Sequence, residues 1–170
     1  TKSVTCAACH GADGNAAVPI YPKLAGQSAT YIVSQLKAFK DGSRADTVMA
    51  GMAAPLSEQD MIDLGNFYAS QQSTPGNGTA NEFGQKLFLD GDVERGITSC
   101  AACHGNDGRG MALAGFPVLA QQNADYLKSQ LEKFRSGARN NDKNSMMSGI
   151  AIKLEDEDIQ ALAQFMSSLN

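Results

Sequence analysis

All four cysteines and both histidines of this 170-residue chain lie in two short motifs. The motifs read Cys6-Ala-Ala-Cys9-His10 and Cys100-Ala-Ala-Cys103-His104. Two thiols with this spacing can form thioethers with the two vinyl groups of haem, and an imidazole directly after them then lies beneath the ring, where it binds iron. The spacing therefore predicts one covalently attached haem at each motif, with His10 and His104 as iron ligands.

Two other uses of paired cysteines compete with haem attachment. A redox disulfide of the thioredoxin kind expects strands around the motif and gives the adjacent histidine no role, whereas strand patterns are absent from this sequence. Four thiolates could also bind zinc tetrahedrally, but one such site would have to bridge the two halves of the chain. Haem attachment uses both motifs and both histidines, so it is the favoured interpretation.

The two motifs open a much longer internal repeat. Each is followed, in the same order, by Asp-Gly, Pro-x-Leu-Ala-x-Gln, Tyr, Gln-Leu, Phe, Gly-x-Arg and Met-x-Gly. A repeat this long is typical of two duplicated domains, because solenoid units have only roughly 20–50 residues. The polar segment 71–79 contains proline and two glycines, as linkers do. We therefore expect domains at 1–72 and 80–170, joined by a linker at 73–79.

Helix patterns fill both halves and predict an all-α fold. The candidate N-caps are Ser28, Asn123 and Ser57, the last in a capping box with Asp60, and the candidate C-terminal glycines are Gly42 and Gly137. The acidic run 155–158 suits a helix N-terminus and marks the counterpart of the Ser57 helix. A further helix is expected at 80–89, with no counterpart in the first half.

The second axial ligand of each iron is inferred by elimination. Because the attachment motifs use every histidine and cysteine, the methionine thioether, a soft ligand that raises the reduction potential of haem, remains the common choice. Among the seven methionines, the repeat pairs Met49 with Met147, each two residues before a glycine. No other methionine position is shared by both halves at a place that could reach the iron. Met49 and Met147 are therefore predicted as axial ligands.

Two further sets of repeated residues have more than one interpretation. Pro22 and Pro117 follow the motifs at similar intervals, and each either restrains a loop through its fixed φ or lies where a backbone carbonyl accepts the imidazole Nδ1–H. Three polar pairs could hydrogen-bond the haem propionates or could have surface or capping roles. These pairs are Tyr31 with Tyr126, Gln27 with Gln122, and Arg44 with Arg139.

Composition and charge exclude several functional classes. The chain has 14 basic and 18 acidic residues and a net charge of −4, and without a basic patch it lacks the electrostatic basis for binding nucleic acid. An apolar content of 42% excludes a disordered chain. No apolar run approaches the roughly eighteen residues needed to cross a bilayer. We therefore expect a soluble globular protein with no nucleic-acid partner.

The chain resembles the dihaem cytochrome c4 family over nearly its whole length. The resemblance rests on the two Cys-x-x-Cys-His motifs, Pro-Lys-Leu-Ala-Gly-Gln at 22–27, Phe-Pro-Val-Leu-Ala at 116–120 and the Met-x-Gly turns. It implies two class I cytochrome c domains related by a pseudo-twofold axis, each wrapped around one covalently bound haem, with Pro22 and Pro117 making the backbone contact to the axial histidine. It also implies a soluble or loosely membrane-associated periplasmic carrier, whose redox partners would be proteins such as a membrane cytochrome complex and a terminal oxidase.

Two departures from the family pattern distinguish the halves. In the second half, 84–88 represents the N-terminal helix of the family, in which a glycine, Gly84, allows close packing near Phe165. The first half shows no counterpart of this helix. We therefore predict that Phe67 and Tyr68 are more exposed than Phe165 and Met166. The two haem environments, and with them the reduction potentials, are expected to differ because matched positions carry different residues: Lys23 and Val118, Asn15 and Arg109.

These features predict an electron-transfer protein rather than an enzyme. Iron in each domain would cycle between the ferric and ferrous states with both axial positions filled, which leaves no position for a substrate or for oxygen. One alternative is a dihaem redox enzyme of the peroxidase kind, with one open or displaceable axial position. A less favoured alternative is a zinc-stapled binding module.

Overall fold

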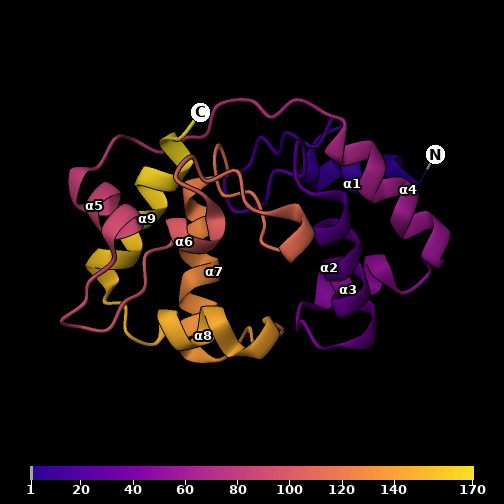
Figure 1. The fold of residues 1–170 in the computed structure, drawn as a ribbon. Coiled ribbons are helices and arrows are strands. Elements are labelled where there is room, and N and C mark those ends of the chain that lie inside the picture. Colours follow the sequence, from indigo (N-terminus) through magenta and orange to yellow (C-terminus); the bar gives the residue numbers. More distant parts are fainter. Residues whose placement is uncertain (1) are drawn as a thin grey trace.

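The computed structural model describes residues 2–170, which form two groups of helices. The first group contains α1 (Ser3–His10), α2 (Ala29–Asp41), α3 (Thr47–Ala53) and α4 (Glu58–Ala69). The second contains α5 (Glu82–Asp90), α6 (Ala101–His104), η1 (Ala112–Ala114), α7 (Ala124–Ser136), η2 (Lys143–Ser145), α8 (Met146–Ala151) and α9 (Asp156–Ser168). Figure 1 shows the groups side by side, the first in indigo to magenta and the second in pink to yellow. Residues 2–170 contain isolated β-bridges but no strand, so the predicted all-α fold is confirmed.

Most helices begin and end where their capping residues predict. Ser28 caps α2 by accepting the Tyr31 amide, and α2 ends at Gly42, which adopts the left-handed conformation with φ of 81°. A full capping box opens α4, in which the Ser57 and Asp60 side chains accept each other's backbone amides. The acidic run that was expected to start the last helix likewise forms a capping box, between Glu155 and Asp158.

The additional helix of the second half is present and packs against the last helix. It was predicted at 80–89, and α5 spans Glu82–Asp90 after an N-cap at Asn81. Gly84 lies at the crossing with α9, where a Cβ atom would be 2.2 Å from the Ala161 carbonyl oxygen. The rings of Phe88 and Phe165 pack nearby, with centroids 5.4 Å apart. Glycine is therefore needed here because the two backbones approach so closely.

The exposure prediction that rested on this helix is only half right. Phe67 on α4 is 37% exposed whereas Phe165 on α9 is 8% exposed, as predicted. Tyr68, however, is 1% exposed against 3% for Met166, so the prediction for Tyr68 is wrong. The reason is that the Tyr68 ring packs inward, close to Gly14 and within the first core, so its burial does not depend on a counterpart of α5.

Each group of helices has its own hydrophobic core. The smaller core consists of Ile32, Leu56, Met61, Leu64 and Tyr68. The larger one consists of Leu87, Phe88, Ile97, Ala101, Leu127, Leu131, Leu154, Ile159, Leu162, Ala163, Phe165 and Met166. Of the helices described, none is long and apolar enough to span a membrane.

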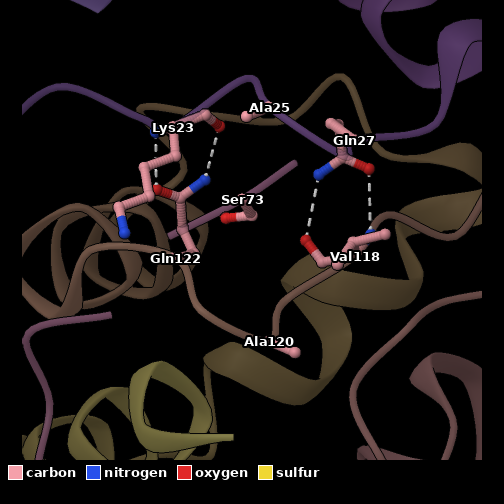
Figure 2. A pocket seen from close by; sticks show the side chains of 7 residues that line it. All are labelled: Lys23, Ala25, Gln27, Ser73, Val118, Ala120 and Gln122. Carbon is pink, nitrogen blue, oxygen red and sulfur yellow. Dashed lines mark hydrogen bonds between the residues drawn. The ribbon is translucent and has the colours of Figure 1, made fainter. Parts of the chain in front are cut away.

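Two glutamine side chains join the halves through matched contacts with the backbone (Figure 2). The Gln27 amide donates to the Val118 carbonyl and accepts the Val118 N–H, both at 3.0 Å. In the same way, Gln122 donates to the Lys23 carbonyl at 2.9 Å and accepts the Lys23 N–H at 2.8 Å. Because equivalent glutamines bind equivalent segments of the opposite half, the interface has the pseudo-twofold character expected of a duplicated chain.

Asn123 also crosses this interface, and the prediction that its side chain caps α7 is wrong. The residue stands at the N-cap position but makes no capping hydrogen bond. Its amide nitrogen donates instead to the carbonyls of Tyr21, at 2.9 Å, and Ala16, at 3.4 Å. The α7 N-terminus gains another acceptor, because Asn77 Oδ1 accepts the Ala124 amide at 2.8 Å.

The polar segment between the halves is held against both of them. The buried Lys23 ammonium donates to the Thr74 carbonyl, the Thr74 hydroxyl and the Pro75 carbonyl at 2.6–3.0 Å. Asn15 accepts the Thr74 amide at 2.8 Å. Gly78 donates its amide to the Ser167 hydroxyl at 3.0 Å. The segment expected as a linker is therefore packed along the interface instead of spanning open solvent.

Candidate haem sites

The first attachment motif forms the C-terminal end of α1, and the second consists of Cys100, which precedes α6, and all of α6. On a helix, two cysteines three residues apart lie on the same face, one turn from each other. Glycines with positive φ, Gly11 at 80° and Gly105 at 79°, end these helices directly after the histidines. All four cysteine side chains are partly exposed. In residues 2–170 no three His, Cys, Asp or Glu side chains are grouped to hold a metal ion, so the zinc alternative has no geometric support.

Each motif histidine is buried and bound through one ring nitrogen to a proline carbonyl. The distance from His10 Nδ1 to the Pro22 oxygen is 2.9 Å, and that from His104 Nδ1 to the Pro117 oxygen is 3.0 Å. A carbonyl can only accept, so Nδ1 carries the proton and Nε2 is the nitrogen left to bind a metal. Burial lowers the pKa of both histidines, while the proline carbonyl opposes this shift. Both rings are therefore oriented and kept neutral, as a metal ligand requires.

The two candidate axial methionines lie on short helices. Met49 is part of α3 and Met147 is part of α8, and both are partly buried. The Met-x-Gly segments are thus helical and not the turns expected from the sequence. Asp46 Oδ1 accepts the Met49 amide at 2.9 Å and caps α3, whereas Asp142 binds the amide and the hydroxyl of Ser148, both at 2.9 Å, and holds α8. Both methionine helices are fixed by an aspartate, at slightly different positions.

Two buried arginines meet at the interface and share the same acceptors. Arg44 donates to Gln35 Oε1 at 2.8 Å and to Gln130 Oε1 at 2.9 Å. Arg139 donates to the same two oxygens, at 3.1 and 2.9 Å. Each guanidinium also binds a tyrosine hydroxyl of the opposite half: Arg44 binds Tyr126 at 2.9 Å, and Arg139 binds Tyr31 at 3.0 Å.

This arginine pair carries two positive charges that no carboxylate of the described residues contacts within ion-pair distance. Each guanidinium stacks over a phenylalanine of its own half, Phe39 at 4.6 Å and Phe134 at 4.5 Å. Burying like charges side by side is unfavourable unless anionic groups face them. Haem propionates are carboxylates with the required charge, so the donor set fits the cofactor.

The structure separates the roles left open for the repeated polar pairs. A surface role is wrong for Arg44 and Arg139, which are buried, and the Gln27 and Gln122 amides are used on the opposite backbone. The acceptors Gln35 and Gln130 were not identified from the sequence. The sequence did contain a signal for them, because Gln35 and Gln130 occupy matched positions of the repeat. A polar residue at matched positions of a duplicated chain can contact its own counterpart across the pseudo-twofold axis.

Comparisons with known proteins agree with this geometry. The cytochrome c family profile matches residues 3–72 and 82–170. Cytochrome c4 of Thiocapsa roseopersicina is 46% identical over 168 residues, covering 97% of this chain and 87% of that protein. The thiosulfate dehydrogenase electron acceptor of Thiomonas intermedia is 37% identical over 174 residues, covering 98% of this chain and 79% of that protein.

A solved structure extends the similarity to three dimensions. Reduced recombinant cytochrome c4 from Pseudomonas stutzeri superimposes with a TM-score of 0.94 at 40% identity, covering 99% of this chain and 95% of that one. Both attachment motifs and both helical groups fall within this overlap. The chain therefore belongs to the dihaem cytochrome c4 family of electron carriers, with one haem c attached covalently in each of its two cytochrome c domains.

Proposed function

We propose that this protein is a periplasmic carrier that moves single electrons between redox proteins and does not itself catalyse a reaction of a substrate. The observation that carries the proposal is the matched pair of buried, neutral histidines, each fixed by a proline carbonyl at 2.9–3.0 Å. Two equivalent, rigidly oriented ligands suit a group that changes charge without changing its coordination. Haem supplies the one-electron couple between ferric and ferrous iron at each site.

The proposed iron ligands are His10 with Met49 in the first domain and His104 with Met147 in the second. A methionine thioether favours ferrous iron and raises the reduction potential. The aspartates that fix α3 and α8 support this role, because a ligand held by its helix needs little rearrangement when the iron changes charge. With both axial positions filled, neither domain has a coordination position for a substrate.

The visible spectrum of the purified protein tests this assignment. Low-spin His/Met haem gives sharp α and β bands on reduction and a weak far-red band in the ferric protein. High-spin features in the spectrum, together with turnover of hydrogen peroxide, would favour the dihaem peroxidase alternative instead. A protein that contains zinc and has no Soret band would contradict both assignments.

We propose further that the haem propionates supply the negative charge that faces the arginine pair. Arg44 and Arg139 would then hold both cofactors from one hydrogen-bonded cluster at the domain interface. The support is the burial of both guanidinium groups and the absence of any carboxylate ion pair to them among residues 2–170. A positive charge at this position also favours the reduced state of a nearby haem.

Electrons are proposed to leave toward a terminal oxidase, and one class of donor is suggested by a relative. The Thiomonas protein, similar over 98% of this chain, is a thiosulfate dehydrogenase electron acceptor. We therefore propose a periplasmic dehydrogenase of this kind as an electron donor. In stopped-flow experiments, thiosulfate with its dehydrogenase should reduce both haems within the turnover time of the enzyme. Reduction no faster than by thiosulfate alone would exclude this donor.

A further inference from the structure

One buried hydroxyl in the first domain has no hydrogen-bond partner. Tyr68 is 1% exposed, and its hydroxyl oxygen is the single buried side-chain polar atom without a partner among residues 2–170. Buried polar groups are almost always paired, because an unpaired one loses its hydration without compensation. An exception in an otherwise satisfied domain points to a group that this hydroxyl meets in the assembled protein.

The surroundings of Tyr68 identify that group. The tyrosine lies in the last turns of α4, and its carbonyl accepts the Gly26 amide at 3.0 Å, which fixes its backbone. Its ring lies so close to Gly14 that a Cβ there would be 2.8 Å from the Tyr68 Cδ1 atom. Cys6 packs against the same cluster. Burial, and next the nearby Cys6 thiol, raise the pKa of Tyr68, so the hydroxyl keeps its proton and remains a donor.

The second domain has no such hydroxyl. Met166 occupies the matching position on α9, is 3% exposed, and belongs to the core against which Cys100 packs. Each position therefore belongs to the core against which the first cysteine of its own motif packs, but only the tyrosine of the first domain has a hydrogen-bond donor.

We propose that the Tyr68 hydroxyl donates a hydrogen bond to the Cys6 sulfur once that sulfur is the thioether of the first haem. Thioether sulfur is a weak acceptor, and the buried surroundings leave the hydroxyl no water to bind instead. The bond makes Tyr68 a positioning residue for the thioether. It also directs the positive end of the O–H dipole toward the haem edge, which favours the reduced state of the first haem relative to the second.

This inference rests on covalent attachment of haem at Cys6 and does not depend on the identity of the axial ligands. A failure of the proposed Met49 ligation would appear as a missing far-red band in the unmodified protein. It would leave a comparison of tyrosine with phenylalanine at position 68 fully interpretable.

The test uses the holoprotein with Tyr68→Phe, which removes only the hydroxyl, and with Met166→Tyr, which adds one to the second domain. In the half-reduced protein, the distribution of the electron between the haems is read from the haem-methyl NMR signals. The loss of one hydrogen bond changes an equilibrium constant by roughly two- to tenfold. Tyr68→Phe should therefore shift the electron-exchange equilibrium away from the first haem by about this factor. Met166→Tyr should shift it in the same direction, by favouring the second haem.

A second readout separates hydrogen bonding from a structural effect. The C–S stretching bands in the resonance Raman spectrum should move on transfer of the unmodified protein to D₂O and should stay fixed in Tyr68→Phe. The potential of the second haem in the same molecule serves as the internal control and should not change in Tyr68→Phe. An unaltered electron distribution in this variant, or a D₂O shift that persists in it, would overturn the proposal.

Discussion

The two domains hold their histidines in the same way but support their last helices differently. In the second domain, Arg95 forms a two-pronged ion pair with the buried Asp158 at 2.7 and 3.0 Å and also binds Asp92 at 2.7 Å. The corresponding Asp60 of the first domain has one ion pair, to the exposed Lys2 at 3.0 Å. Helix α5 packs on α9, whereas the described residues contain no equivalent helix on α4.

The comparison shows which features a haem domain of this type keeps and which it can vary. The contacts that orient the proposed iron ligands have nearly the same length in both domains, 2.9 and 3.0 Å, because ligand geometry sets the chemistry. The contacts that stabilise the surrounding helices differ, because several arrangements can supply similar stability. The first domain has the smaller core and should depend more on its cofactor and on its neighbour for stability.

The largest expected effect is at the crossing of α5 and α9, which has no counterpart among the described residues of the first domain. Replacing Gly84 with valine would drive a side chain into the Ala161 carbonyl, since even a Cβ would be 2.2 Å away. We expect Gly84→Val to lower the free energy of unfolding of the second domain by about 3 kcal/mol. Denaturant titration of the holoprotein checks this result. Gln85→Ala, on the exposed face of the same helix, should have little effect, and equal destabilisation by both would contradict the packing account.

The next effect concerns the ion pair that fixes the start of α9. Asp158→Asn keeps the size of the side chain but removes the charge that faces Arg95 in a buried position. We expect a loss of roughly 2 kcal/mol in the free energy of unfolding, because the guanidinium loses its buried partner. The matched variant Asp60→Asn changes the equivalent capping carboxylate but breaks an ion pair to the exposed Lys2, so it should cost less. A larger loss for Asp60→Asn would reverse the proposed ranking of the two supports.

A smaller effect is expected at the two arginines of the interface. Burial opposes the charge of Arg44, but its pKa is raised overall because Tyr126, Tyr31 and Asp46 favour the charged form. Arg139 instead donates to the neutral Asn141 at 3.0 Å. Both arginines are buried to the same extent, so each places one positive charge in the cluster.

We expect Arg139→Met to lower the mean reduction potential of the haems by about 60 mV, a tenfold effect for a one-electron couple. Arg44→Met should lower it by a similar amount, because it removes the same unit of positive charge from the same buried cluster. Spectroelectrochemical titration measures both shifts. Arg135→Met, which removes a guanidinium bound to Leu154 and Asp156 outside the cluster, serves as control. Equal shifts for all three variants would mean that the interface arginines affect the reduction potential no more than an arginine outside the cluster does.

The smallest effect is the acid sensitivity of the first domain. Hydrogen bonds from the Ser57 backbone and side chain, and then from Lys2, lower the pKa of Asp60 from 3.8 to about 2. A depressed carboxyl pKa stabilises the fold above the unfolded value and loses this contribution as the pH falls through the folded value. Stability of the first domain should therefore fall between about pH 4 and pH 2, and less steeply in Asp60→Asn. Identical pH profiles of unfolding for the two proteins would contradict the role of Asp60.

Local signals in the sequence predicted the elements well but not the contacts between halves. Ser57 with Asp60, and the glycines after α2 and α7, predict helix ends because capping depends on a few neighbouring residues. Asn123 has the same local signal, yet two carbonyls of the other domain compete successfully for its amide. No pattern within one segment can reveal such a partner more than a hundred residues away.

The burial of Tyr68 shows a second limit of reasoning from the repeat. In the second domain a helix covers the last helix, and the sequence shows no counterpart of it within residues 1–72. The repeat therefore predicted an exposed Tyr68. The prediction treated adjacent residues alike, although neighbours on a helix point in directions about 100° apart. Phe67 faces the side that α5 would cover, while Tyr68 faces its own core.

The most direct test of the account is carbon monoxide binding to the reduced protein and to Met49→Ala and Met147→Ala. Carbon monoxide needs a vacant iron position, so the unmodified protein should bind none when a histidine and a methionine fill both sites. Each single variant should bind one molecule, and the double variant two. Binding by the unmodified protein, or no binding by either single variant, would contradict the claim that each domain holds its own six-coordinate haem.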